Sequence, residues 1–85
     1  MMYGTLKQLD EELHAAFEKR EAARKEKLNA NIAFIADINT QTLQAYQDAD
    51  AAFKRTVKEY ELAELKRRAE VIVLKIEELE RELAE

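Results

Sequence analysis

Apolar residues recur at steps of three and four along most of this chain, which is the spacing of one face of an α-helix. In the N-terminal part the repeat begins with Leu6, Leu9, Leu13 and Phe17. The same face then passes through a basic stretch and ends at aliphatic positions. Its later members are Arg20, Arg24, Lys27, Leu28, Asn31, Ile35 and Ile38. We therefore expect a first helix over about residues 5–36, whose packing stripe is apolar at both ends and basic in the middle, with long cationic stems lying along it.

The start of this helix carries its own signal. Thr5 and Gln8 have the spacing of a capping box, in which each side chain bonds the backbone of the other residue. Gly4 stands directly before Thr5. The pattern predicts that Thr5 is the N-cap.

The weakest helical stretch lies at residues 37–42, where β-branched and short polar residues compete with the helix for backbone hydrogen bonds. Asp37, Asn39 and Thr40 are all residue types that cap a following helix. We predict a turn at about 37–41. A turn at 29–31, where Asn29 and Asn31 stand, and a single uninterrupted helix are alternatives that the sequence leaves open.

A second helix is predicted from about residue 42 to 84. Its first half has Leu43, Tyr46, Asp50, Phe53, Val57 and Tyr60 at heptad steps. Its second half starts a new register with a strict three-four alternation, which is typical of a coiled coil. We call the seven residues of this second register the C-terminal seam: Leu62, Leu65, Ala69, Ile72, Ile76, Leu79 and Leu83.

Antiparallel pairing about a turn near residue 39 places helix 1 beside the first half of the C-terminal seam. It predicts the contacts Leu6 with Ile72, Leu9 with Ala69 and Leu13 with Leu65. The second helix then continues for about a dozen residues, or about 18 Å, without a partner. The predicted fold is all-α: a single domain over residues 1–85, an antiparallel two-helix hairpin of coiled-coil type with a longer second helix, assembled into a dimeric helical bundle.

Composition supports this fold class and narrows the function. The 85 residues include one glycine and no proline, so the residues that make hairpins and long loops are nearly absent. Without cysteine there is no disulfide framework and no cysteine-based zinc site. The first residues lack the features of a signal peptide, and no apolar run approaches the length of a bilayer span, so we expect a cytoplasmic protein and no membrane partner.

The charges are arranged as a dipole in the C-terminal third. The chain has a net charge of −4; residues 54–68 carry six bases and three acids, whereas residues 69–85 carry six acids and two bases. Two copies of the second helix that lie antiparallel bring the acidic end of each toward the basic segment of the other, which orients the pair. We therefore expect a homo-oligomer, with a dimer favoured.

Candidate chemistry is sparse. Glu11 and His14 have the Glu-x-x-His spacing of carboxylate-bridged metal bundles, but both project away from the predicted packing stripe. Serine is absent, and the acidic pairs lie in glutamate runs without pocket walls. The basic clusters are interleaved with Glu18, Glu21 and Glu26, which does not favour a nucleic-acid partner. We predict no catalytic, cofactor-binding or metal-ligating residue, no cofactor, and no enzyme.

The expected function is a non-enzymatic protein–protein interaction module that acts as an adaptor, small chaperone or scaffold for a larger partner. Apolar side chains on two sides of the second helix indicate more than one neighbour. The predicted interaction residues are Tyr60, Leu62, Leu65, Val71, Ile72, Leu74, Ile76, Leu79 and Leu83. The alternative is a small acidic inhibitor or regulator, of the kind that phages encode as accessory proteins, which blocks a nucleic-acid-handling protein.

Overall fold

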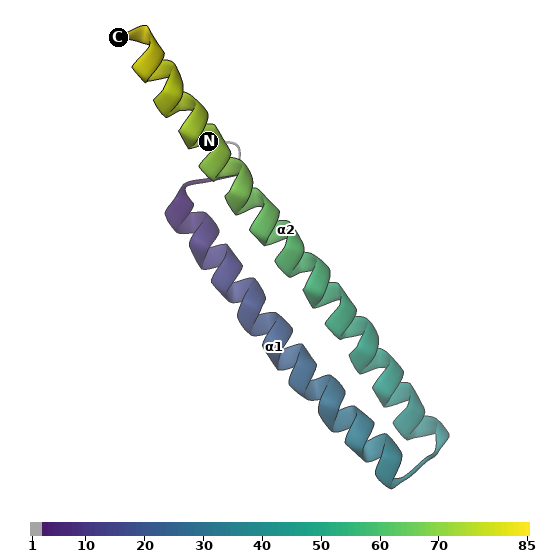
Figure 1. Cartoon of the computed structure of the whole chain (residues 1–85). Coiled ribbons are helices and arrows are strands. Elements are labelled where there is room, and N and C mark those ends of the chain that lie inside the picture. The colour runs from purple at the N-terminus through teal and green to yellow at the C-terminus, as the bar shows by residue number, and fades with distance from the viewer. Residues whose placement is uncertain (1–2) are drawn as a thin grey trace.

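The computed structural model describes residues 3–85 and consists of two α-helices joined by a short turn (Figure 1). Helix α1 spans Leu6–Ala36 and helix α2 spans Thr40–Ala84. The helices run antiparallel, and α2 extends well past the start of α1 (Figure 1). The predicted all-α hairpin with a longer second helix is confirmed. Met1 and Met2, the first residues of the predicted domain, lie outside the described residues.

The predicted capping box at the start of α1 is confirmed. Thr5 Oγ1 accepts a hydrogen bond from the Gln8 backbone N at 3.2 Å, and Gln8 Oε1 accepts one from the Thr5 backbone N at 2.9 Å. Gly4 precedes this box with a φ of +130°, where a Cβ atom would lie 2.9 Å from Gln8 Oε1. Glycine therefore allows the backbone conformation that leads into α1, which a residue with a side chain would adopt only with strain and a clash.

A second capping box forms the turn. Asn39 is the N-cap of α2: its Oδ1 accepts from the Thr42 backbone N at 2.9 Å, and Thr42 Oγ1 accepts from the Asn39 backbone N at 3.1 Å. Asp37 is the C-cap of α1. Polar side chains thus make the turn without glycine or proline, and α2 begins at Thr40 because Asn39 supplies the cap. The alternative turn position at 29–31 lies inside α1.

Ion pairs between the helices fix the antiparallel register. They join residues whose separation along the chain matches a turn at 37–39, which lies within the predicted 37–41; α2 begins two residues earlier than predicted. The pairs are Lys19–Glu59 at 3.5 Å, Lys27–Asp50 at 2.9 Å and Lys66–Glu12 at 3.1 Å, together with Arg67–Asp10.

The face that α2 turns toward α1 differs from the prediction. The buried residues of α2 are Ala63 and Glu70, which are 3% and 1% exposed, whereas Leu65 and Ile72 are 57% and 58% exposed. The predicted packing of Leu65 and Ile72 against α1 is therefore wrong. The hairpin uses a face of small side chains and long polar stems, because a small residue such as Ala63 lets the helices approach closely.

The α1 stripe is correct in its middle except at Arg24, which is exposed, and it is wrong near the turn. Arg20 and Lys27 lie in the helix interface as predicted: the Arg20 guanidinium lies 4.3 Å from the ring centroid of Tyr60, and Lys27 Nζ lies 5.3 Å from that of Phe53. Near the turn, by contrast, the predicted stripe residues Leu28, Ile35 and Ile38 are exposed. Phe34 takes their place, stacked on Tyr46 with ring centroids 6.4 Å apart.

Candidate functional site

The C-terminal seam is exposed to solvent along α2. Its six large side chains are between 46% and 87% exposed, and Ala69 is half-buried. Leu62 and Leu65 are exposed even though they lie in the part of α2 that runs alongside α1. Leu79 and Leu83 are exposed near the end of α2. A row of aliphatic residues this long, rimmed by charged residues, is typical of an association surface.

The seam and the hairpin interface lie on nearly opposite sides of α2. Ala63 and Glu70 are buried against α1, whereas Leu62 and Ile72 are exposed. At about 100° per residue, the centre of the seam lies about 150° around the helix from the buried pair. A second helix can therefore pack on the seam without displacing α1.

The end of α2 forms an overhang (Figure 1). The interhelical ion pairs place the first residue of α1, Leu6, near the level of Ile72, so α2 continues for about a dozen residues, or about 18 Å, beyond α1. Among the described residues no other element lies beside the overhang, which carries Ile76, Leu79 and Leu83.

The remaining predicted interaction residues divide into two groups. Val71 and Leu74 are 42% and 40% exposed and lie on other sides of α2 from the seam. Tyr60 is half-buried, with its ring centroid 6.3 Å from that of Phe17 and the Arg20 guanidinium over its face. The structure therefore places Tyr60 in the hairpin interface, apart from the exposed seam.

A second exposed apolar surface was missed by the sequence reasoning. Leu28, Ile32 and Ile35 form a stripe on α1 near the turn, and they are 52%, 57% and 68% exposed; we call them the turn-end patch. Ile38 in the turn and Leu43 in the first part of α2 are exposed as well. The helical spacing of the patch is present in the sequence, but the predicted α1 stripe places Leu28 and Ile35 in the hairpin interface.

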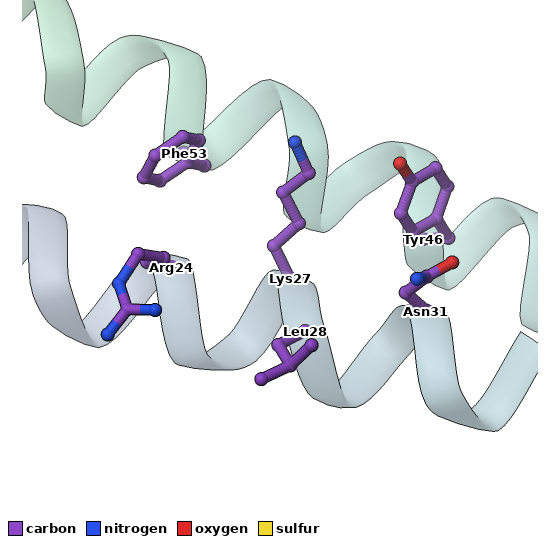
Figure 2. A pocket seen from close by; sticks show the side chains of 6 residues that line it. All are labelled: Arg24, Lys27, Leu28, Asn31, Tyr46 and Phe53. Atoms are coloured by element: carbon purple, nitrogen blue, oxygen red, sulfur yellow. The ribbon is translucent and has the colours of Figure 1, made fainter.

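A shallow groove of about 350 Å³ runs between the helices next to the turn-end patch. Figure 2 shows Lys27 rising from α1 between Phe53 and Tyr46 of α2, with Leu28 at the edge. Leu28 belongs to both the groove and the turn-end patch. The remaining lining residues are Arg24 and Asn31.

The cations that line the groove are paired with acidic side chains. Asp50 lies 2.9 Å from Lys27 and 3.0 Å from Lys54. Its hydrogen bond to Lys27, assisted by Lys54, lowers the pKa of the Asp50 carboxyl below its ordinary 3.8, and the same bond raises the pKa of Lys27 above 10.5. Lys27 is thus paired with Asp50, and the second lining cation, Arg24, is paired with Glu21 of α1 at 3.1 Å, so both cations of the groove have an acidic partner.

Another charge cluster supports the hairpin nearer its middle. The hydrogen bond from Arg55, together with the charge of Lys19 on α1, lowers the pKa of Glu59 below 4.5. Because Lys19 belongs to α1 and Glu59 to α2, their ion pair joins the two helices here, while Arg55 holds Glu59 from within α2.

The polar candidates considered for metal chemistry lie on the surface. The imidazole of His14 is 72% exposed and lies 3.0 Å from Glu18, one helical turn away. Within residues 3–85, no group of three or more histidine, cysteine, aspartate or glutamate side chains has an arrangement that could hold a metal ion. The described surface instead carries rows of exposed apolar residues that are bordered by charged residues.

The chain matches no protein family, no curated protein and no solved structure. Neither helix within residues 3–85 is both long enough and apolar enough to cross a bilayer.

Proposed function

We propose that this chain is a non-enzymatic protein–protein interaction module: a self-associating hairpin that serves as an adaptor, small chaperone or scaffold for a larger partner. The observation that carries the proposal is the exposure of the C-terminal seam, whose six large aliphatic residues are each at least 46% exposed. Monomeric proteins rarely leave so long a row of aliphatic side chains in water.

The hairpin is well suited to present such a surface. Capping boxes at Thr5 and Asn39 define the start of each helix, and ion pairs such as Lys27–Asp50 hold the helices together. The long α2 therefore carries the seam on a continuous helical scaffold of 45 residues. A helix face on such a scaffold binds its partner at little entropic cost, because few groups are ordered on binding.

The test is a pull-down from an extract of the source cells with three immobilised forms of the chain: wild type, the double variant Ile76→Asp/Leu83→Asp, and Ile32→Asp as control. Ile32 and the seam residues are similarly exposed aliphatic residues on helices. We expect wild type and Ile32→Asp to retain a specific set of proteins, including the added soluble chain itself, that the double variant loses. Equal retention by all three forms would contradict a role for the seam.

One observation favours a second candidate, the acidic regulator. The overhang exposes Glu77, Glu78, Glu80, Glu82 and Glu85. A complex with a basic protein through these glutamates weakens steeply with salt, whereas a complex through the apolar seam depends little on salt. Retention that is lost between 50 and about 300 mM salt in wild type, and that is unaffected by Ile76→Asp/Leu83→Asp, would support the regulator.

A further inference from the structure

We propose that the occupant of the C-terminal seam is a second copy of this chain, with the two α2 helices antiparallel about a two-fold axis that passes beside residue 74. This inference rests on the proposed self-association and adds its orientation and register. Leu65 then lies opposite Leu83 of the second copy, Ala69 opposite its Leu79, and Ile72 opposite its Ile76.

The seam has the spacing that such a pairing requires. From Leu62 to Leu83 the steps alternate strictly between three and four over three heptads, so the side chains form successive layers against a facing helix. Every large member of the seam is exposed, and α1 lies on the other side of α2. The pair can therefore form without any rearrangement of the hairpin.

Side-chain volume favours the antiparallel orientation. In a parallel, in-register pair, Ala69 faces Ala69 of the second copy, and the two small side chains leave a gap in the middle of the seam. In the antiparallel pair each Ala69 faces a leucine, so small and large residues are combined in the same layer. Packing without such gaps favours the antiparallel pair, because a void in an apolar layer destabilises it.

Charge at the ends of the seam favours the same orientation. Residues 74–85 carry five glutamates against Lys75 and Arg81, so parallel copies place two acidic ends side by side. Antiparallel copies instead place the acidic end near Arg68, whose partner in its own chain is Glu64 on the same helix, whereas Lys66 and Arg67 are paired with α1. The two helix dipoles also oppose each other in that arrangement, with each negative C-terminus beside the middle of the other helix.

The flanking charges then select the register. Glu61, Arg68, Lys75 and Glu82 each precede a seam residue and are exposed. With the axis beside residue 74, Arg68 lies next to Glu82 of the second copy, twice in the dimer. A shift by one heptad pairs Leu65 with Ile76, and it brings Arg68 next to Lys75 and Glu61 next to Glu82, which are like charges.

The chosen register also covers the overhang. Each overhang, about residues 74–84, lies along residues 64–74 of the other copy, so the end of α2 that has no neighbour in its own chain is covered by the second copy. Lys75 approaches its equivalent near the axis, where each lysine lies 3.4 Å from Glu78 of its own chain. The product is a closed, two-fold arrangement of four helices, in which the two α2 helices lie between the two α1 helices.

Cysteine cross-linking tests this inference, and the chain contains no native cysteine to interfere. Two single variants are prepared, Leu65→Cys and Leu83→Cys, and each is oxidised alone and in an equimolar mixture. We expect the mixture to yield chiefly the mixed disulfide, and each variant alone to yield little. Ile76→Cys mixed with Leu65→Cys is the register control and is expected to cross-link poorly.

Three results would overturn the inference. A disulfide of Leu65→Cys with itself indicates a parallel pair, and efficient linkage of Leu65→Cys to Ile76→Cys indicates the shifted register; both leave the proposed function standing. A wild-type chain that sediments as a monomer at all concentrations overturns the second copy as occupant. If that monomer still retains a protein through the seam, the interaction module survives; if it retains none, the proposed function fails as well.

Discussion

The ammonium group of Lys27 lies 2.9 Å from the carboxylate of Asp50, so a salt bridge joins α1 to α2 where a two-helix core usually has an aliphatic layer. Lys27 Nζ also lies 5.3 Å from the ring centroid of Phe53, and Lys54 contacts the same carboxylate at 3.0 Å. Polar contacts of this kind hold the hairpin together on one side of α2. The residues of the C-terminal seam are left on the other side.

The first prediction concerns pH. The pKa of Asp50 is lower than its ordinary 3.8 in the folded chain because of its bond to Lys27, so the stabilisation is present above about pH 4 and is lost as the pH falls through the lowered pKa. Glu59 behaves in the same way below its ordinary 4.5. We expect Asp50→Asn to have a lower Tm than wild type at pH 7 and the same Tm near pH 2.

Thermal unfolding followed by circular dichroism at pH 7, 5, 4, 3 and 2 measures this difference. The difference in Tm between the two proteins isolates the effect of Asp50 from that of the other carboxyl groups that titrate in the same range. The raised pKa of Lys27 predicts a second loss in wild type, as the pH rises above 10.5 and the ammonium group loses its proton. A Tm difference that stays constant from pH 7 to pH 2 would show that Asp50 does not act through its charge.

The second prediction concerns the core of the hairpin. Leu9 is 1% exposed, so Leu9→Ala removes buried methyl groups and leaves a cavity, at a cost of about 2–3 kcal/mol in the free energy of unfolding. Leu28→Ala is the matched control on the same helix; Leu28 is 52% exposed, and we expect a loss below about 0.5 kcal/mol. Urea unfolding of both variants at one protein concentration makes the comparison. Equal losses would mean that Leu9 is not a core residue.

The third prediction tests which face of α2 meets α1. Ala63 is 3% exposed, and Ala63→Leu inserts a large side chain between the helices, at a cost of about 1–3 kcal/mol. The neighbouring change Leu62→Ala removes a side chain that is 54% exposed. At protein concentrations where the chain is monomeric, we expect Ala63→Leu to lower the free energy of unfolding and Leu62→Ala to leave it nearly unchanged. The reverse order would indicate that the hairpin packs through the seam.

The fourth prediction tests the charge pair that sets the register. Reversal by Arg68→Glu, or by Glu82→Arg, replaces two attractions in the dimer by two repulsions, and we expect the Kd for self-association to rise about tenfold. The double variant Arg68→Glu/Glu82→Arg restores opposite charges and is expected to return near the wild-type Kd. Sedimentation equilibrium gives the three values. Additive weakening in the double variant would contradict the proximity of Arg68 and Glu82.

The sequence predicts the local structure of this chain well. Capping signals are short-range chemistry, so Thr5 with Gln8, and the polar turn at Asp37 and Asn39, can be identified without knowledge of the packing. The register follows from the position of the turn, and the Lys19–Glu59 pair agrees with it.

The packing face could not be predicted from the same pattern. Counting large aliphatic residues gives weight to Leu65 and Ile72, whereas the hairpin interface is made by Ala63, by aromatic rings such as Tyr60, and by stems such as that of Arg20. Such residues are individually weak signals of burial, because alanine is common on both sides of a helix and arginine usually marks the solvent side. The two faces of α2 are distinguished only when α1 is placed against one of them.

The mass of the chain in solution, measured by sedimentation equilibrium from about 1 to 500 µM, tests the central claim most directly. Wild type is predicted to approach twice the 9.9 kDa of one chain as the concentration rises. Ile72→Asp, at a seam residue that is 58% exposed, is predicted to remain at the monomer mass, whereas Ile32→Asp, at a residue that is 57% exposed on α1, still dimerises. A wild-type mass of 9.9 kDa at every concentration, or a dimer that Ile72→Asp does not weaken, would contradict the account.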